Sequence, residues 1–384
     1  MIKKVTILSH QKFPSGDASA IRYVNLASIF RRLNYEVVAI GMGNTPYGEY
    51  FDFEYGKYVS LRQKSKSIFH KVFQNLLREK RLIEFAIKHH NNSNIFFVCS
   101  GLSKKSRKTL SIFAAKNKIT LIYNVMEWFS KKQYFLNGLF SIPYHKNNSF
   151  IRQFKKQDGK IVAISRYLNE YFSSKGIQSL YLPFVFDENH FATLPRKSHK
   201  GINIFYIGRS RNKDDLYRML VGFDIAKEKI DGKVNVFIVG ENRKTIRKAR
   251  NNNLLHDWIV VKGEVNNQEA LELLSNADYT VLLRPPHERF AKAGFPTKVA
   301  ESLFAGVPVI TNLTSNLSDY LVDGANSIIV NDYSAKAFSE AIIRAVSVTG
   351  DDYENMRIEA RKTALDNLEA GLFSEDFRKF LNDN

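Results

Sequence analysis

The segment "YTVLLRPPHERFAKAGFPTKVAESLFAGVPVITN", residues 279–312, contains a complete strand–helix–strand pattern. An apolar run at 279–284 leads into a polar loop, and a helix is expected to begin at Pro296, because proline is favoured in the first helical turn. Gly306 then ends the helix as its C′ residue, and the next strand is expected at 308–311. Apolar strands separated by helices are typical of parallel sheets that are buried on both faces.

The same alternation extends along most of the chain. The expected strands are at residues 5–9, 36–41, 95–99, 120–125, 160–165, 202–208, 234–240, 258–263, 279–284, 308–311 and 327–330, with helical patterns such as 19–33 between them. The rhythm stops at "YLPFVFDENHF", residues 181–191, and then restarts. A single core stops growing near about 250–300 residues. We therefore predict two doubly wound α/β domains, 1–187 and 188–367, with the helical residues 368–384 packing back on the first.

Composition narrows the class of protein. The chain has 384 residues with 44% hydrophobic and 25% charged residues, which is ordinary for a globular protein. Its one cysteine, Cys99, excludes an internal disulfide framework and fits a reducing compartment. The N-terminal residues lack the apolar region of a signal peptide, and no apolar run approaches the roughly 18 residues that span a bilayer. These features predict a cytoplasmic protein that is soluble, or peripheral on a membrane.

The charge is distributed unevenly. The formal net charge is +19; residues 1–187 hold 30 Lys and Arg against 11 Asp and Glu, while the remainder holds 27 of each. The whole excess therefore belongs to the first half. Such asymmetry suggests an anionic partner, either nucleic acid or an anionic membrane face, although a solvated basic surface is the plainer alternative.

A loop that follows one expected strand carries a pair of candidate phosphate-binding cations. In "FYIGRSRNKDDL", residues 205–216, the strand ends at Gly208, Arg209 and Lys213 follow, and a helix begins. A helix N-terminus favours anions, and charge-assisted hydrogen bonds to phosphate are strong, so this loop is a candidate diphosphate site. The alternative is that both cations are ordinary exposed residues beside the acidic first turn of the helix.

The helix expected at Pro296 presents a second candidate site. Gly294 and Phe295 would offer backbone amides to an anion at its N-terminus. Glu301 is an acid within an apolar series, and its carboxylate suits two neighbouring sugar hydroxyls. Lys298 lies one turn earlier. The alternatives are a solvent-facing Glu301 and a Lys298 that extends along the surface to water.

Two weaker loops complete the set. Gly16 lies in "SHQKFPSGDASAIRYVNLASIF", residues 9–30, between a strand and a helix, and Gly263–Glu264–Val265 forms a turn that could hydrogen-bond a flat base or simply connect two elements. The dinucleotide fingerprint G-x-G-x-x-G is absent from the first loop, which argues against a nicotinamide or flavin enzyme. The chain also shows no DxD in a suitable loop and no His/Cys metal spacing, so no metal and no cofactor are expected.

In their order along the chain these loops resemble the retaining glycosyltransferases of family four, which have the GT-B fold of two Rossmann-like domains facing a central cleft. The resemblance covers most of the chain and is most specific in "GFPTKVAESLFAGVPVITN" and the following "LSDYLVDGANSIIV". It is also carried by "IGRSRNK", by "IVAISRYLNEYF" and by "LPFVFDENHF".

The resemblance implies roles by position. Arg209 and Lys213 match the pair that neutralises the nucleotide diphosphate leaving group, and Glu301 matches the second Glu of the family's Glu–seven residues–Glu motif, which holds the ribose. The predicted catalytic residues are Arg209, Lys213 and Glu127, the last facing the acceptor or the reacting carbon unless its role is structural. The predicted donor-binding residues are Gly16, Gly263, Glu264, Val265, Glu288, Gly294, Phe295, Pro296, Thr297, Lys298 and Glu301.

One position departs from the family pattern. The first Glu of the motif should stand eight residues before Glu301, where this chain has Ala293. Glu288 and His287 are near but out of register. The donor sugar must therefore be held differently, through Lys298 or Glu288, which leaves the identity of the sugar open.

The implied activity is a metal-independent hexosyltransferase. It would move a sugar from a nucleotide-sugar, with uridine diphosphate as the expected nucleotide, to a saccharide or lipid-linked saccharide in surface polysaccharide (capsule or O-antigen) biosynthesis. The basic, amphipathic residues 61–156 would then bind an anionic membrane on its inner face, and no nucleic acid is expected as a partner. The alternatives are a GT-B nucleotide-sugar epimerase and a basic nucleic-acid-binding protein.

Overall fold

The chain forms two compact units. The computed structural model describes residues 3–10, 12–13, 18–43, 45–62, 68–90, 92–99, 101–187, 191, 199–210, 212–249 and 258–383, without the side chains of 18, 68–76, 135, 137, 248 and 249. Unit 1 comprises Met1–Lys131, Gly138–Asp187 and Glu369–Asn384, and unit 2 comprises Lys132–Asn137 and Glu188–Leu368. The segment Lys132–Asn137, which the sequence assigned to the first domain, therefore groups with unit 2.

In the described part of unit 1, eight strands form one sheet in the order β3-β4-β2-β1-β5-β6-β7-β8. The strands are β1 Lys3–Leu8, β2 Tyr35–Gly41, β3 Tyr50–Phe53, β4 Gly56–Ser60, β5 Ile95–Val98, β6 Thr120–Val125, β7 Lys160–Ala163 and β8 Ser179–Tyr181. Every pairing is parallel except the β3–β4 hairpin. The helices are α1 Ala18–Arg32, α2 Ile68–Lys88, α3 Lys104–Lys116, α4 Ile142–Gln153, α5 Arg166–Ser173 and α13 Ser374–Asn382.

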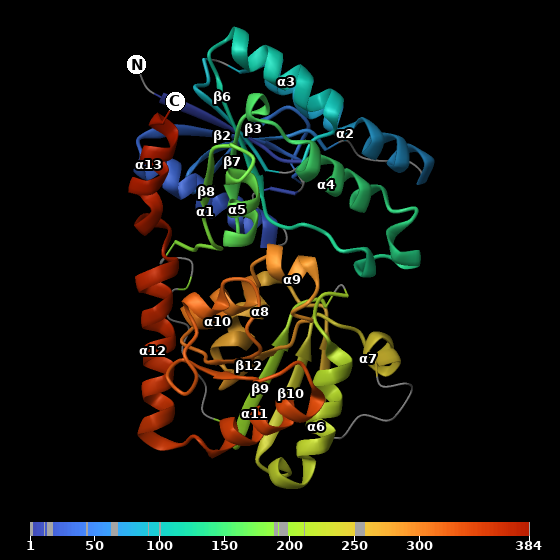
Figure 1. Ribbon diagram of the computed structural model, residues 1–384, viewed down its shortest axis with the longest axis vertical. Coiled ribbons are helices and arrows are strands. Elements are labelled where there is room, and N and C mark those ends of the chain that lie inside the picture. The colour runs from blue at the N-terminus through green and yellow to red at the C-terminus, as the bar shows by residue number, and fades with distance from the viewer. Residues whose placement is uncertain are drawn as a thin grey trace. The chain divides into compact units, whose positions relative to one another are not determined.

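The C-terminal helix α13 belongs to the core of unit 1. It lies beside α1 (Figure 1), and its Phe377 is fully buried against Phe30 of α1, with 5.2 Å between the ring centroids. The chain returns to unit 1 next to the point where it leaves it, because the amide of Ala370 donates to the carbonyl of Phe186. Arg32 forms ion pairs with both Asp187 and Glu369, and so it links the segment that leaves unit 1 to the segment that returns to it.

Two parts of unit 1 differ from the sequence expectation. The hairpin of β3 and β4 was not expected. Edge strand β3 alternates between half-exposed and exposed residues, and β4 has only two apolar side chains, Tyr58 and Val59, and so no long apolar run. The segment 181–191 was interpreted as a connector. Its first residues instead complete unit 1: β8 ends at Tyr181, and Leu182, Phe184 and Phe186 are fully buried.

In the described part of unit 2, six parallel strands form a sheet in the order β11-β10-β9-β12-β13-β14. They are β9 Ile202–Ile207, β10 Val234–Val239, β11 Ile259–Gly263, β12 Tyr279–Leu282, β13 Val309–Thr311 and β14 Ser327–Ile329. The helices are α6 Leu216–Ile230, α7 Arg243–Ala249, α8 Asn267–Ser275, α9 Arg289–Ala293, α10 Thr297–Phe304, α11 Ala335–Ser347 and α12 Gly350–Leu368. The predicted α/β class with two doubly wound, mainly parallel sheets is confirmed.

Local sequence explains where the helices of unit 2 begin and what they cover. Asp215, Asn266 and Ser334 are N-caps whose side chains accept a backbone amide in the first turn of α6, α8 and α11. Helices α6 and α11 pack against each other and against one face of the sheet (Figure 1), where Phe223 and Phe338 meet with 5.4 Å between ring centroids.

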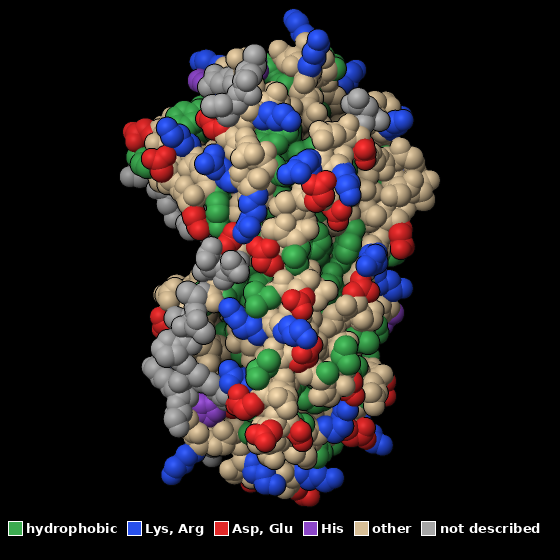
Figure 2. Space-filling view, turned by 90° about the vertical axis from the view of Figure 1, so that its left-hand side faces the viewer, with side chains coloured by type: hydrophobic (Ala, Val, Ile, Leu, Met, Phe, Trp, Pro, Cys, Tyr) green, Lys and Arg blue, Asp and Glu red, His purple; other side chains and the backbone are tan. Residues whose placement is uncertain are grey.

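Helices α12 and α13 each expose a face of mixed charge. Figure 2 shows basic and acidic side chains interspersed, and three pairs lie within single helices: Arg357–Glu354, Lys362–Glu359 and Arg378–Glu375. Such surface pairs stabilise a helix only slightly, by about 0.3–0.5 kcal/mol each. These faces are therefore not the basic surface that the net charge predicts.

Candidate active site

The candidate site is built at the carboxyl edge of the unit 2 sheet. The carboxyl ends of parallel strands lie along one edge, so the segments that follow them come together in space. The loop 208–213 follows β9, Glu241 follows β10, Glu264 follows β11 and Arg284 follows β12. This edge brings together residues of three of the predicted motifs.

The loop 208–213 turns sharply and is held by main-chain hydrogen bonds. Gly208 has φ +117°, a backbone conformation that favours glycine, and a Cβ there would meet Cε of Lys298 at 2.7 Å and displace that side chain. The amide of Lys213 donates to the carbonyl of Ser210 at 2.7 Å. The amide of Ser210 donates to the carboxylate of Glu241 at 2.6 Å, which fixes the loop on the end of the neighbouring strand.

The predicted diphosphate residue Arg209 and the predicted base-pocket residue Glu264 form an ion pair. Nη2 of Arg209 lies 2.6 Å from Oε2 of Glu264, and the two side chains are 50% and 67% exposed. Lys213 is half-buried on the same loop. Both cations are therefore accessible at the sheet edge, and Arg209 already binds an anionic group.

The turn 263–265 has the backbone conformation that its glycine permits. Gly263 has φ +76°, and its carbonyl accepts a hydrogen bond from the amide of Gly240 at 2.6 Å. Glu264 is exposed and Val265 is half-buried. The hydrogen bond between Gly240 and Gly263 links the carboxyl end of β10 to the carboxyl end of β11.

The start of helix α10 differs in detail from the expectation. Pro296 is the N-cap, with φ −76°, and the helix begins at Thr297. The loop before it was expected to be irregular, but 289–293 form the short helix α9. The amide of Gly294 closes α9 by donating to the carbonyl of Phe290 at 2.9 Å, so in this structure it does not point toward a free anion site as predicted.

The end of α10 follows the sequence expectation closely. Gly306 has φ +65°, its amide donates to the carbonyl of Leu303, and the amide of Val307 donates to the carbonyl of Ser302. These two hydrogen bonds make a Schellman motif, which requires the left-handed conformation at C′ that glycine adopts readily. At the other end, the buried ring of Phe295 packs edge-on against Tyr320 with 5.8 Å between centroids.

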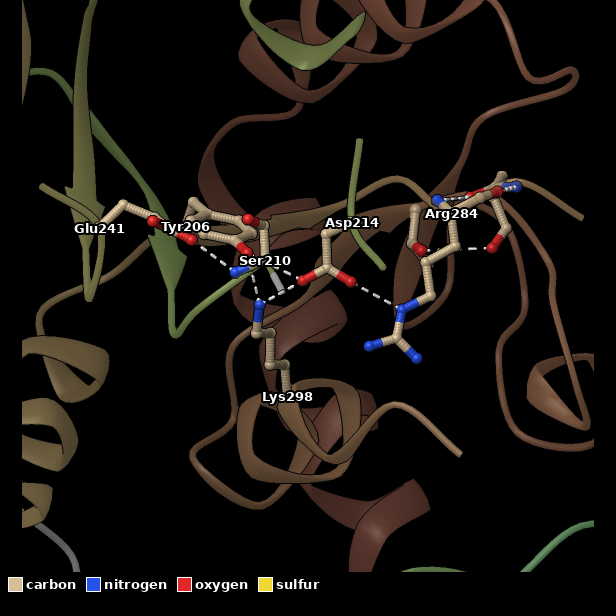
Figure 3. A network of polar contacts seen from close by, with 8 residues as sticks. Tyr206, Ser210, Asp214, Glu241, Arg284 and Lys298 are labelled. Atoms are coloured by element: carbon tan, nitrogen blue, oxygen red, sulfur yellow. Dashed lines mark hydrogen bonds and ion pairs between the residues drawn. The ribbon is translucent and has the colours of Figure 1, made fainter. Parts of the chain in front are cut away.

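Lys298 lies in a buried polar network rather than on the surface (Figure 3). Its ammonium donates to the carboxylate of Asp214 and to the hydroxyl of Tyr206, the latter at 2.7 Å. Tyr206 in turn donates to Asp214 at 2.8 Å, and Lys298 lies over the tyrosine ring at 4.0 Å from its centroid. Burial lowers the pKa of Lys298, and the neighbouring Asp214 opposes that shift.

Asp214 is the centre of this network. Its side chain is 1% exposed, and its second oxygen accepts from Nε of Arg284 at 2.7 Å. Burial alone would raise the pKa of this carboxyl, but Lys298 and Arg284 outweigh burial and hold the pKa at about 2. Asp214 is therefore ionised at neutral pH, and it fixes two cations immediately beside the loop 208–213.

Glu301 occupies a different electrostatic environment on the same helix. It is half-buried one turn after Lys298, and no ion pair neutralises it among the described residues. Burial raises its pKa to about 7, while Lys298 opposes the shift. A carboxyl with this pKa changes its protonation state near neutral pH, as functional carboxyls often do.

The position of the missing acid holds no carboxylate. Ala293 is fully buried at the end of α9. Glu288, the nearby candidate, is the N-cap residue of α9, and its carboxylate lies 3.1 Å from Nζ of Lys132 and 3.6 Å from Nε2 of His287. Glu288 is therefore already engaged by two neighbours.

The two unit 1 candidates are placed less completely. Glu127 follows β6 and is half-buried; its carbonyl accepts from the side chain of Asn147 at 3.0 Å. Gly16 lies outside the described residues. Among the residues that are described, no group of three or more His, Cys, Asp or Glu could hold a metal ion, and no helix has the length and apolar character to cross a membrane.

Sequence reasoning missed four residues of the site: Tyr206, Asp214, Glu241 and Arg284. Asp214 was noted only as part of an acidic first turn, and nothing in the sequence links it to Lys298, 84 positions away. The one available signal was position, since Glu241 and Arg284 both follow apolar strands and are polar.

The fold and the loops at this sheet edge define the class of protein. Residues 187–363 match the family model of "Glycosyl transferases group 1". The chain has the GT-B fold, and its residues 187–363 are similar to the group 1 glycosyltransferases. The predicted resemblance to GT-B glycosyltransferases is confirmed. No curated protein sequence matches the chain.

Several solved structures are similar over nearly the full length. A glycosyltransferase from Rickettsia africae has a TM-score of 0.67 at 16% identity, covering 99% of this chain and 100% of that one. WaaG, a glycosyltransferase involved in lipopolysaccharide biosynthesis, has 0.68 at 12%, covering 99% and 100%. Alr3699/HepE from Anabaena, in complex with UDP, has 0.64 at 12%, covering 98% and 99%. At such low identity these likenesses establish the fold.

Proposed function

We propose that the chain is a retaining glycosyltransferase that transfers a sugar from a uridine diphosphate sugar to a saccharide or lipid-linked saccharide of a surface polysaccharide, capsule or O-antigen. The group 1 match over 187–363 supports the reaction class. HepE has been crystallised with UDP and with UDP-glucose, which favours a UDP-sugar donor. The role of WaaG in lipopolysaccharide biosynthesis favours a surface polysaccharide.

The observation that carries this proposal is the cationic loop after β9. Arg209 and Lys213 stand on the loop 208–213 at the carboxyl edge of the sheet, beside the N-terminus of α6. Charge develops on the diphosphate as it departs, and groups that are already oriented toward it stabilise the transition state; loss of one such group typically costs on the order of 100- to 1,000-fold in rate. Glu301 would hold the ribose hydroxyls.

The same cations remove the need for a metal ion. Arg209 and Lys213 supply the charge that a divalent ion would bring to the diphosphate, so we propose a metal-independent hexosyltransferase without a cofactor. Transfer should proceed at an unchanged rate in the presence of a chelator. A rate that falls with chelator and returns with Mg²⁺ or Mn²⁺ would contradict metal independence and leave the transferase assignment intact.

An apolar hollow in unit 1 supports a lipid-linked acceptor. It measures about 550 Å³ and is lined by Leu102, Ser103, Lys104, Leu139, Phe140, Ile142, His145, Lys146 and Ser149. Leu139, Phe140 and Ile142 are 64%, 79% and 73% exposed, which is unusual for such large apolar side chains. Lys104 at its wall suits the phosphates of an anionic lipid, whereas Lys146 is paired with Glu79.

We further propose that this surface docks on the inner face of the cytoplasmic membrane. The proposed contact region, 61–156, contains the hollow; residues 63–67 and the side chains of 68–76 lie outside the described residues. Anionic vesicles should retain the protein at low salt, and Phe140→Ser with Ile142→Ser should release it. Retention by neutral vesicles, or no retention by anionic ones, would contradict membrane docking.

Two assays test the transferase itself. Thermal shifts with a panel of nucleotide sugars identify the donor, because a ligand that binds only the folded state raises the melting temperature. With that donor, uridine diphosphate should be released only when an acceptor saccharide is present; release or isomerisation without acceptor would indicate an epimerase. Arg209→Ala and Glu301→Ala should each reduce transfer strongly, and near-normal rates in both would overturn the site.

A further inference from the structure

The guanidinium of Arg284 is fixed by one hydrogen bond through Nε, but its two terminal nitrogens take no part in that bond. Its Nε donates to Asp214 at 2.7 Å, and its side chain is 11% exposed. Figure 3 shows the two terminal nitrogens directed away from Asp214, and within the described part of the chain neither has a hydrogen-bond or ion-pair partner. The half of the guanidinium that could bind a ligand therefore remains available.

The main chain at Arg284 is fixed as well. Its amide donates to the side-chain oxygen of Asn312 at 2.9 Å, and its carbonyl accepts from the side-chain nitrogen of Asn312 at 2.8 Å. The preceding carbonyl of Leu283 accepts from the amide of Asp215 at 2.8 Å, which ties the end of β12 to the end of the loop 208–213. Arg284 is thus anchored to both β13 and the cationic loop.

Charge in the network favours an anion. Asp214 is one carboxylate between two cations, so the group of Asp214, Lys298 and Arg284 keeps one positive charge in excess. Lys298 is committed to Asp214 and Tyr206 beneath Gly208. The surplus charge is therefore presented by Arg284, whose planar fork matches phosphate oxygens in a bidentate manner.

We propose that Arg284 is a further binding residue for the diphosphate of the nucleotide donor and that Asp214 is the residue that positions it. The proposal rests on the proposed function, since it adds a third cation to the site of Arg209 and Lys213. It assigns this role to a guanidinium that follows β12 and lies on the opposite side of Asp214 from Lys298. Asp214 acts through orientation and touches no ligand.

The test compares the affinity for UDP with the affinity for UMP. If the donor base is not uracil, GDP is compared with GMP and ADP with AMP in the same way. Arg284→Gln should weaken the diphosphate by about tenfold or more, which corresponds to one charge-assisted hydrogen bond, and weaken the monophosphate by less than about twofold. The matched control Arg344→Gln removes an equal charge from a surface pair with Asp323 and should leave both affinities unchanged. Equal weakening of both nucleotides, or of neither, would overturn the role of Arg284.

The positioning role of Asp214 is tested with the ratio of the affinities for the nucleoside diphosphate and the monophosphate. Asp214→Asn keeps the size of the side chain but loses its hold on Arg284, so it should lower diphosphate selectivity, whereas a general structural defect should weaken both nucleotides alike. If Asp214→Asn fails to fold, Arg284→Lys provides a second test. This variant keeps the positive charge and the pairing with Asp214, so it should recover part of the diphosphate selectivity that Arg284→Gln loses. Wild-type protein that binds no nucleoside diphosphate would reject the proposed function, while normal UDP binding by Arg284→Gln rejects only this inference.

Discussion

The guanidinium of Arg209 lies 2.6 Å from the carboxylate of Glu264, although the two residues belong to loops that follow different strands. Both side chains are at least half exposed, and exposed pairs contribute only about 0–1 kcal/mol. The ion pair is therefore weak enough for Arg209 to leave Glu264 and bind a phosphate instead.

The first prediction concerns this exchange. Glu264→Gln removes the competing carboxylate, so UDP should bind more tightly, by up to about fivefold, because 1 kcal/mol is the upper limit for such a pair. Isothermal titration measures the change. Glu269→Gln, which removes an equal charge from the exposed face of α8, is the control. Weaker UDP binding in Glu264→Gln would instead mean that Glu264 contacts the nucleotide itself.

The raised pKa of Glu301 leads us to expect that the folded protein becomes less stable as pH rises. Its folded-state pKa is about 7, above the ordinary value of 4.5, so between these values the unfolded chain releases a proton that the folded chain retains. The free energy of unfolding should therefore fall as pH rises from 4.5 to 7, by up to about 3 kcal/mol, and then level off. Urea unfolding across this range should show less decline for Glu301→Gln than for wild type.

The same carboxyl predicts that nucleotide binding releases a proton. Ribose hydroxyls donate to an ionised carboxylate, so binding should lower the pKa of Glu301 and displace its proton below about pH 7. Affinity for UDP should then increase from pH 6 to pH 8. Titration calorimetry in buffers of different ionisation enthalpy counts the protons. Wild type and Glu301→Gln with the same proton count would show that Glu301 does not hold the ribose.

The periodicity of the sequence was sufficient to predict most strands of both sheets. The strand at 120–125 agrees residue for residue with β6, and the positions of Gly306 and Pro296 located both ends of α10 to within one residue. These elements are determined locally, by continuous apolar runs and by residues with restricted or permissive backbones. The β3–β4 hairpin was missed because edge strand β3 has no buried residue and β4 has only two apolar side chains, so neither strand carries such a run.

The polar network could not be predicted in the same way. Lys298 has the sequence context of a surface lysine. Only the pairing of β9 with β12, and of β12 with β13, brings it to Asp214 and Tyr206. Contacts between residues far apart in sequence follow from strand order, which a single sequence does not encode locally. For Arg284 the sequence indicated only a polar residue after a strand.

The buried pairing of Asp214 predicts a large loss of stability on its removal. Asp214→Ala leaves Lys298 and Arg284 without their carboxylate, and an uncompensated buried charge costs about 3–5 kcal/mol. Urea unfolding should show this loss. Adding Lys298→Met should restore part of it, because one of the two unpaired cations is then gone. The control Glu375→Ala breaks a pair with Arg378 in which both side chains are 57% exposed, and should cost under about 1 kcal/mol.

The last prediction concerns the return of the chain to unit 1. Phe377 of α13 is fully buried and packs edge-on against Phe30, in a core that, apart from Ala370, Phe377 and Phe380, consists of buried residues before Asp187. Phe377→Ala should lower the free energy of unfolding by about 3–5 kcal/mol, because a large cavity remains in a core that spans distant parts of the sequence. Leu372→Ala, at a position that is 51% exposed, is the matched control and should change it little. If Phe377→Ala were no more destabilising than Leu372→Ala, α13 would be only loosely attached, and unit 1 would owe its stability to residues before Asp187 alone.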